Sequence, residues 1–393
     1  MSPPPTIDLE DLGLDRGAHL LIERALRDLV PGDRLQVLGR DAQLPIHLRA
    51  WCRAHGHGFE ADGPTIVRGD ADHARWDDAA RVGAATPDGL AARAGPGWGL
   101  AARGALVEAG GPEPRFELDQ RDQLWADVVP RLYAQALAGQ WDPATAIDWD
   151  AGAQLPADVE AAVVQVMTYL VENEMAALVV PARFLGRIHP YFREVVQLLA
   201  VQVADEARHV EVFTRRAELR GGDLGVSGAG GRASLQTLLD EPDFVLASFL
   251  LSVLGEGSFL NLLGFLDEHA PDPVTAQVAH LARQDEARHV AYGVAHLEFL
   301  CASDPGVREQ LRVAVHRRHD ALAQTAGLNR QVFDALVVLA AGSWSPADIG
   351  RGFDAVERLQ AEMDEGRRRR LTRLGFPDQD AAELSALHTR NFM

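Results

Sequence analysis

The chain has 393 residues, of which 47% are hydrophobic, so it is long enough for two or three folding units and a substantial core. With 38 Lys and Arg against 57 Asp and Glu, its formal net charge of −19 argues against a nucleic-acid partner or an anionic membrane surface. Two cysteines, Cys52 and Cys301, provide no disulfide framework and no thiolate zinc site. Since the N-terminus also lacks a secretory pattern, we predict a cytoplasmic protein.

The first 70 residues alternate between strand-like and helix-like patterns, which predicts a small α+β domain. The expected strands and helices are a strand at 6–12, a helix at 18–29, a strand at 34–38, a helix at 44–55, a strand near 59 and a strand at 65–68. The turn Pro31-Gly32-Asp33 separates the first helix from the second strand.

Two runs of this domain, Leu29-Val-Pro-Gly-Asp-Arg-Leu-Gln-Val37 and Trp51-Cys-Arg-Ala-His-Gly-His57, resemble TusA-like sulfurtransferases. That family carries sulfur on the Cys of a Cys-Pro-x-Pro motif at the start of its first helix. The matching positions here read Asp15-Arg-Gly-Ala18, so the nucleophile is missing. Cys52 falls in the second helix, where a thiol is more often a small buried hydrophobe than a reactive group. The resemblance therefore implies a degenerate domain that docks or packs and does not transfer sulfur.

Residues 71–150 are expected to connect two domains. The part up to about residue 120 is rich in Ala, Gly and Pro without a clear period, which predicts short helices and loops. A helical period returns over 122–139, where Pro130 is expected to cause a kink. Trp141 and Trp149 then mark a turn into the main domain.

Residues 151–300 show four apolar helical stripes, and each stripe carries a glutamate. On the first helix, Glu174 lies on the stripe whereas Glu172 points to the opposite side, so Glu174 is the predicted ligand of the two. The four inward glutamates are Glu174, Glu206, Glu256 and Glu286.

One of these helices, Phe244 to Leu266, is apolar and long enough to span a bilayer. Glu256 in its middle, Asn261 nearby and the lack of a flanking Lys or Arg cluster favour a buried helix of a soluble bundle. We therefore expect no membrane association.

The six-residue sequence Asp205-Glu-Ala-Arg-His-Val210 recurs, residue for residue, at 285–290. A Glu and a His three positions apart lie on one face of a helix and can bind one metal ion. Two such pairs, together with one Glu from each of two further helices, are typical of the two-metal carboxylate bundle. The predicted metal ligands are Glu174, Glu206, His209, Glu256, Glu286 and His289, with Glu206 and Glu286 expected to bridge the ions.

Metal is the simplest way to accommodate this cluster, because each unpaired buried carboxylate would otherwise cost roughly several kcal/mol. Carboxylate and imidazole ligands without thiolate suit iron or manganese better than zinc. Asp205 and Asp285 are expected to accept the free N–H of a ligand histidine on the opposing helix. The alternative is a cluster without metal, ion-paired to Arg208 and Arg288.

The connections predict a ferritin-like topology. Short turns join the first and second helices and the third and fourth, and a glycine-rich segment at 221–231 provides the long crossover between the pairs. Helical periods beyond residue 300, at 307–323, 332–341 and 347–370, are expected to cover the bundle. The chain is thus predicted to divide into the parts 1–70, 71–150, 151–300 and 301–393.

Residues 156–300 resemble the ferritin-like diiron carboxylate oxygenases and oxidases, which include ribonucleotide reductase small subunits, acyl-carrier desaturases and p-aminobenzoate N-oxygenase. The resemblance implies a mainly α fold and a diiron-dependent oxidoreductase. Its two Fe ions, with Mn or mixed Mn/Fe as alternatives, would activate O2 so that a monooxygenase or oxidase hydroxylates, N-oxygenates or desaturates a small organic substrate. It also implies an external electron donor, such as a ferredoxin or a reductase, and leaves a homodimer open.

Two departures narrow this resemblance. Phe213 stands where ribonucleotide reductase subunits carry a radical tyrosine, and Ala282 stands where the N-oxygenase has an additional histidine. Phe213, Tyr292 and His296 are candidates for a substrate pocket, although a hydrogen-bonded core histidine is the commoner role for a residue such as His296. No catalytic residue beyond the metal ligands is predicted.

Two other classes of function remain open on the sequence. One is a ferroxidase or another metal-handling protein without an organic substrate. The other is an interaction module whose bundle holds metal only for stability. The apolar residues around the predicted ligands favour the oxygenase or oxidase, because they suit a small apolar substrate and shield the site from water.

Overall fold

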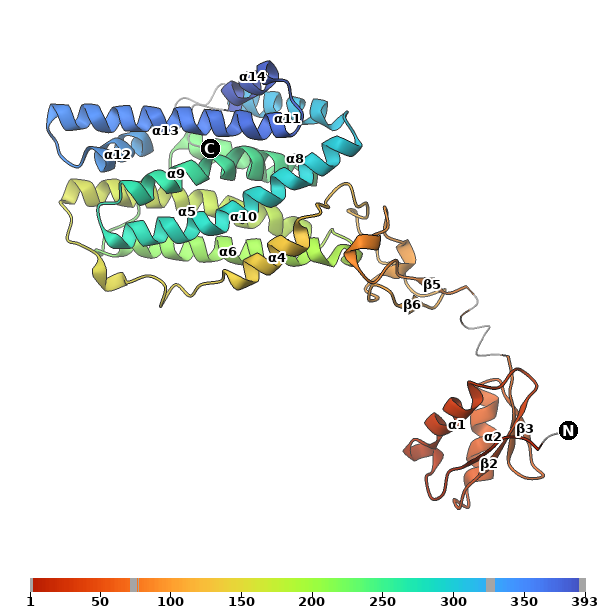
Figure 1. Ribbon diagram of the computed structural model, residues 1–393. Helices are drawn as coiled ribbons and strands as arrows, with labels where there is room; N and C mark the ends of the chain where they lie inside the picture. Colours follow the sequence, from red (N-terminus) through yellow and green to blue (C-terminus); the bar gives the residue numbers. More distant parts are fainter. Residues whose placement is uncertain (1–2, 71–75, 77, 323–328, 389–393) are drawn as a thin grey trace. The chain divides into compact units, whose positions relative to one another are not determined.

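The computed structural model describes residues 3–70, 76, 78–322 and 329–388, drawn in colour in Figure 1. Contacts divide the chain into two compact units: Met1–Gly89 with Gly95–Pro114, and Leu90–Ala94 with Arg115–Met393. The finer division into four parts stays a prediction.

The first unit is an α+β fold around a four-stranded sheet. Its strands lie in the order β1-β2-β4-β3, with β1 parallel to β2 and the other pairs antiparallel. The elements are β1 (Thr6–Asp8), η1 (Leu14–Arg16), α1 (Ala18–Leu26), β2 (Arg34–Leu38), α2 (Leu44–Ala54), β3 (Gly58–Glu60), β4 (Thr65–Val67), β5 (Ala80–Arg81), η2 (Pro87–Gly89), η3 (Pro96–Trp98) and β6 (Leu106–Val107). The expected elements of residues 6–70 are present, with shorter ends, and β5 pairs with β6 in a ribbon that the sequence had not indicated.

The main core cluster of this unit consists of apolar residues. Ile22 from α1, Val37 from β2 and Leu48 from α2 are fully buried, because the helices turn one face each toward the sheet. Cys52 belongs to the same core at 1% exposure, and burial raises the pKa of its thiol to about 11. At neutral pH the thiolate is therefore scarce, which agrees with a structural cysteine. The resemblance to sulfurtransferases stays a prediction.

The second unit is helical. Its elements are α4 (Val129–Ala138), η4 (Trp149–Ala151), α5 (Ala157–Leu185), η5 (Pro190–Phe192), α6 (Arg193–Glu218), α7 (Ala229–Leu239), α8 (Phe244–Ser248), η6 (Phe249–Glu256), α9 (Gly257–Glu268), α10 (Pro273–Ser303), α11 (Val307–Leu322), α12 (Arg330–Ala341), α13 (Pro346–Arg373) and α14 (Asp378–His388). In the bundle, α5 pairs with α6, and η6 with α9 pairs with α10 (Figure 1). The crossover between the two pairs contains α7, so the helical, ferritin-like architecture is the predicted one.

One local expectation was wrong. Pro130 does not kink a helix over 122–139, because α4 begins only at Val129 and Pro130 occupies its first turn. A proline is favoured at this position, since its missing N–H has no partner within the helix there. Pro181, by contrast, lies inside α5, and the helix continues through it to Leu185.

The helices beyond residue 300 cover the bundle. Leu336 of α12 and Val356 of α13 are fully buried and share one apolar core with Val163 of α5 and Leu262 of α9. Ala323, the expected end of the first of these helices, lies outside the described residues.

By length and composition, two of the described helices could cross a membrane, and the bent pair α12 and α13 would add a third if it formed one span. These are α5, with a mean hydropathy of 1.3, and the continuous segment Phe244–Glu268, with 1.6. The protein itself buries 61% and 83% of their apolar windows. Each also carries a buried glutamate, Glu174 or Glu256, which favours packing in a helical bundle.

Candidate metal centre

Six carboxylate and imidazole side chains meet inside the bundle. The helices α6 and α10 each provide a Glu and a His from one face, while α5 and η6 provide one Glu each. None of the six is more than 5% exposed: Glu174, Glu206, His209, Glu256, Glu286 and His289. All residues that the sequence singled out as ligands are thus brought together.

The cluster consists of two overlapping groups that share Glu206 and Glu286. One group adds Glu174 and His209, the other adds Glu256 and His289, and within each the candidate ligand atoms lie within 4.8 Å of one another. The two shared carboxylates therefore occupy the place of bridging ligands between two ions.

Both histidines turn the same ring nitrogen into the cluster. His209 Nδ1 lies 3.2 Å from Glu206 Oε2 and 3.2 Å from Glu286 Oε1, and its third carboxylate neighbour, Glu174 Oε2, is 3.5 Å away. His289 Nδ1 lies 2.9 Å from Glu206 Oε1 and 3.4 Å from Glu286 Oε2. A pair of ions among these atoms would have oxygen and nitrogen ligands only.

The cluster fits two divalent ions because its own hydrogen bonds leave it incomplete. In the described part of the chain, the following buried ligand atoms have no hydrogen-bond partner: Glu174 Oε1, Glu206 Oε1, Glu256 Oε2, both Oε atoms of Glu286 and His289 Nδ1. Buried polar atoms are rarely left in this state. As metal ligands, four ionised glutamates and two neutral histidines would carry four negative charges, which two divalent cations would balance.

The electrostatics of the cluster indicate the same missing positive charge. Burial, together with the neighbouring carboxylates Glu206 and Glu286, raises the pKa of Glu174 and of Glu256 well above its usual range. Burial would also raise the pKa of Glu206, but the two histidines outweigh it and hold that pKa well below its usual range. Carboxylates packed this closely cannot all stay ionised without a cation.

The outer nitrogens of both histidines point to aspartates of the opposite hairpin. His209 Nε2 lies 3.1 Å from Asp285 Oδ2, and His289 Nε2 lies 3.3 Å from Asp205 Oδ2. With the aspartates as acceptors, Nε2 carries the proton and Nδ1 is left free to bind a metal ion. Although burial opposes it, these histidines lower the pKa of both aspartates, which therefore remain ionised.

Further side chains hold the aspartates in place, and the sequence did not single them out for this role. Arg208 Nη2 donates to Asp285 at 2.8 Å and also to Asp205, while Arg288 donates to Asp285. The segment after α4 adds a donor for each aspartate: Gln140 Nε2 to Asp205 Oδ1 and Trp141 Nε1 to Asp285 Oδ2, both at 2.8 Å. The tryptophan had been assigned only to a turn. The arginines thus bind the aspartates, which are distinct from the glutamates of the metal cluster.

Glu256 is delivered by an unusual backbone. The segment η6, Phe249–Glu256, is a π-helix inserted between α8 and α9, whereas Glu174 comes from a regular α-helix. π-helical segments in proteins occur frequently at functional sites. Gln202 of α6 donates to Glu256 Oε1 at 3.2 Å and so fixes one of its oxygens. The apolar stripe did not reveal this change of helix type.

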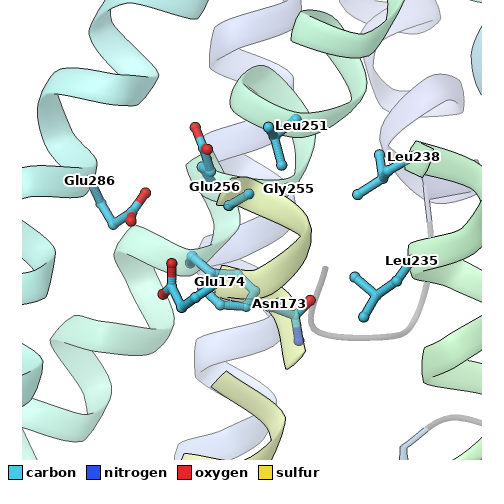
Figure 2. A pocket seen from close by; sticks show the side chains of 10 residues that line it. Asn173, Glu174, Leu235, Leu238, Leu251, Gly255, Glu256 and Glu286 are labelled. Carbon is cyan, nitrogen blue, oxygen red and sulfur yellow. The ribbon is translucent and has the colours of Figure 1, made fainter. Parts of the chain in front are cut away.

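A narrow cavity adjoins the cluster between α5, α7 and η6 (Figure 2). It is lined by Asn173, Glu174, Ala177, Leu235, Leu238, Leu251, Gly255, Glu256, Phe259 and Glu286. Its volume of about 20 Å3 has room for roughly one water molecule. Figure 2 shows Leu235 and Leu238 of α7 across the cavity from the glutamates, so the wall that faces the candidate metals is apolar.

The residues predicted for a pocket lie elsewhere in the core, and none of them lines this cavity. Phe213 is fully buried with its ring 6.3 Å from that of His209. The Tyr292 hydroxyl donates to the carbonyl of Leu124 at 2.9 Å, and its ring stacks on His296 at 5.9 Å. Burial lowers the pKa of His296 to about 4, so this histidine is neutral at physiological pH.

No family model and no curated protein matches the sequence. Among solved structures, several R2-like ligand-binding oxidases are similar to this chain at low identity. A variant with an Mn/Fe cofactor gives 18% identity over 62% of this chain and 92% of its own, with a TM-score of 0.47. A variant with an Fe/Fe cofactor is 20% identical over 62% of this chain and 92% of its own, with a TM-score of 0.44. A form without metal is also 20% identical, over 62% of this chain and 96% of its own, with a TM-score of 0.45. The function proposed below rests on the site itself.

Proposed function

We propose that this protein is a non-haem oxidase or oxygenase with two metal ions, either two irons or one manganese and one iron. It would activate dioxygen to oxidise a small organic substrate. The observation that carries the proposal is the facing pair of Glu-x-x-His motifs, whose buried carboxylates and Nδ1 atoms form two overlapping sets of ligands. Carboxylate-rich sites of this composition suit iron and manganese.

Glu206 and Glu286 would bridge the ions, while Glu174 with His209 and Glu256 with His289 would complete the two sites. When bound, two ferrous ions supply the electrons with which dioxygen is reduced. Asp205 and Asp285 keep the histidine protons on Nε2, so that the Nδ1 lone pairs remain directed at the metals. The protein thus holds the ligand side chains in position before any ion arrives, and protons would leave Glu174 and Glu256 when the ions bind.

The apolar wall of the cavity would exclude water and orient the substrate. Leu235 and Leu238 lie across the cavity from the glutamates and Leu251 also lines it, so a substrate bound there would be desolvated beside the metals. We also propose a cytoplasmic location and an external electron donor, as expected from the sequence.

Metal analysis is the first test. After anaerobic loading with ferrous iron, elemental analysis should find about two irons per chain. A value near zero, or stoichiometric zinc that resists exchange, would contradict the proposal.

Oxygen chemistry is the second test. Stopped-flow mixing of the reduced protein with dioxygen should give a transient absorption whose decay an organic substrate accelerates. Repeated additions of ferrous iron separate this enzyme from a ferroxidase. Sustained oxidation of many irons per chain, with a mineral product and no effect of any organic compound, would establish the ferroxidase instead.

A further inference from the structure

A second polar cluster, outside the metal centre, surrounds the guanidinium of Arg318 on α11. This side chain is only 5% exposed. Its Nη2 donates to Ser234 Oγ at 2.7 Å, whereas Nε and Nη1 have no hydrogen-bond partner among the residues that the structure describes. Burial lowers the pKa of Arg318 to about 10, so it keeps its positive charge at neutral pH.

No counterion accompanies this charge among the described residues, since no carboxylate of theirs lies within ion-pair distance of Arg318. Arg216 on α6 illustrates the contrast, because this buried arginine is held by Glu160 and by Asp272, at 2.7 and 2.6 Å. Buried charges in proteins are usually paired. The guanidinium of Arg318 therefore lacks an anion.

Tyr169 of α5 provides a further donor, near enough to this guanidinium for their charges to interact. It is 4% exposed, and its hydroxyl has no hydrogen-bond partner in the described part of the chain. Burial raises its pKa well above the usual range, while the charge of Arg318 acts in the opposite direction. Two nitrogens of Arg318, Nε and Nη1, and the Tyr169 hydroxyl are donors without an acceptor among the described residues. A carboxylate offers several acceptor positions and no donor.

This cluster borders one cavity directly. Arg318 lines an outer cavity of about 300 Å3, together with Thr237, Asp240 and Leu250 and with the ion pair of Arg317 and Glu241, whose charges offset each other. Ser234 directly precedes Leu235, which lines the cavity beside the metal ligands. The ring of Tyr169 stacks at 6.0 Å on Phe259, which lines that inner cavity too. Through these neighbours on α7 and α9, the Arg318 cluster adjoins the residues that line the cavity beside the glutamates.

We infer that Arg318, Tyr169 and Ser234 bind the carboxylate of the substrate, whose apolar body extends past Leu235 and Leu238 to the metal centre. The second half of this inference rests on the proposed function. Tyr169 precedes Glu174 by five positions on α5, a rise of about 8 Å along the helix. That length suits a small monocarboxylic acid with a short alkyl or aryl body.

The inner cavity sets a condition for this binding. With room for roughly one water, it admits the apolar body only after α7 has moved outward from Glu174 and Glu256. Figure 2 shows that Leu235 and Leu238, both on α7, form the wall that would have to yield. The glycine-rich segment 221–228 precedes α7 and provides the backbone freedom for such a shift.

Binding to the metal-free, full-length protein tests the inference independently of oxygen chemistry. The probes are octanoate and its neutral counterpart octanamide, measured by titration calorimetry. We expect octanoate to bind at least tenfold more tightly than octanamide. The preference should vanish in Arg318→Met, which replaces the charge by an apolar side chain of similar length, and should weaken severalfold in Tyr169→Phe.

A matched control is Arg312→Met on the same helix, because Arg312 already has an ion-pair partner in Asp380. This variant should keep the preference for octanoate over octanamide. Equal binding of acid and amide, or an unchanged preference in Arg318→Met, would overturn the inference. If acetate bound as tightly as octanoate, the inference would also be overturned, because the site would then bind an anion without contacting the apolar body of a substrate. If Arg318→Met does not fold, the affinities of the unchanged protein for octanoate and for octanamide decide whether the inference holds.

Failure of this inference and failure of the proposed function give different results. Tight octanoate binding by a protein that takes up no iron would leave the carboxylate site standing and remove the oxidase. A protein that loads two irons and consumes oxygen with neutral substrates, but does not prefer octanoate, would retain the oxidase and lose the carboxylate site.

Discussion

The two halves of the bundle carry the same six-residue motif but support it differently. In the first half Glu174 comes from the regular helix α5, and in the second half Glu256 comes from the π-helix η6. Four residues after the histidine, the first half has Phe213 and the second has Gly293. The same set of ligands can thus be presented by an α-helix in one half and by a π-helix in the other. The residues around the ligands, rather than the ligands themselves, differ between the halves.

Gly293 accounts for part of this difference. A Cβ at Gly293 would lie 2.4 Å from the Cβ of Ser252, a distance that real side chains do not tolerate. The lack of a side chain therefore allows η6 to approach α10 closely, and η6 carries Glu256. In the first half the ring of Phe213 occupies the equivalent position and packs near His209.

The largest effect is expected from removing either terminal glutamate. Glu174→Gln and Glu256→Gln should each lower iron content from about two to about one per chain or fewer, because each supplies a carboxylate to one ion only. Elemental analysis and oxygen uptake measure the loss. Glu172→Gln is the control in α5 and should retain both ions. Loss of metal in Glu172→Gln alone would mean that α5 is rotated about its axis.

Removal of the metals should destabilise the protein, and it should affect the two halves of the bundle to different extents. At free metal a thousandfold above Kd, the bound ions would add about 4 kcal/mol to the free energy of unfolding. In the metal-free protein, hydrogen exchange should accelerate more in Phe249–Glu256 than in the middle of α5, because the π-helix has irregular hydrogen bonding. Equal acceleration in both segments would remove the distinction between the halves.

A smaller effect is expected when a methyl group is inserted between η6 and α10. Gly293→Ala should cost about 1 to 3 kcal/mol of stability and loosen metal binding at Glu256 before Glu174, because Ser252 and its helix must retreat. Chemical denaturation and metal titration measure the two effects. Gly350→Ala is the control: no atom lies within 4 Å of its added Cβ, and alanine favours the helix.

The smallest effect concerns the donors that follow α4. Gln140→Met and Trp141→Phe should each lower stability by about 1 kcal/mol, because Asp205 and Asp285 lose one donor but keep their arginine and histidine contacts. Urea unfolding of the metal-free protein measures this. A much larger loss for one variant would show that the two aspartates are supported unequally, as the two glutamates are.

The parts of the site that the sequence predicted are those governed by local geometry. A Glu and a His three positions apart must share a helical face, and the apolar stripe distinguishes Glu174 from Glu172 without knowledge of the fold. The doubled motif then suggested that the two faces meet. In the same way, the order of the helices followed from their periods and from the short turns between them.

The missed features depend on contacts distant in sequence or on the choice between related helix types. Trp141 is 144 residues from Asp285, and no local pattern relates the two. The π-helix keeps Glu256 among apolar residues, so its composition resembles that of an α-helix. Pro130 was misjudged because a proline can both interrupt a helix and begin one, and only the course of the preceding chain decides.

The histidine–aspartate contacts also bear on the symmetry of the bundle. His209 contacts Asp285 and His289 contacts Asp205, so a histidine of each hairpin is bound by an aspartate of the other. Such reciprocal contacts are the rule for isologous interfaces, in which two identical subunits are related by a two-fold axis. Here one chain contains both partners. The contacts in the interior therefore have the approximate two-fold symmetry of a dimer of hairpins, from which the π-helix η6 departs on one side only.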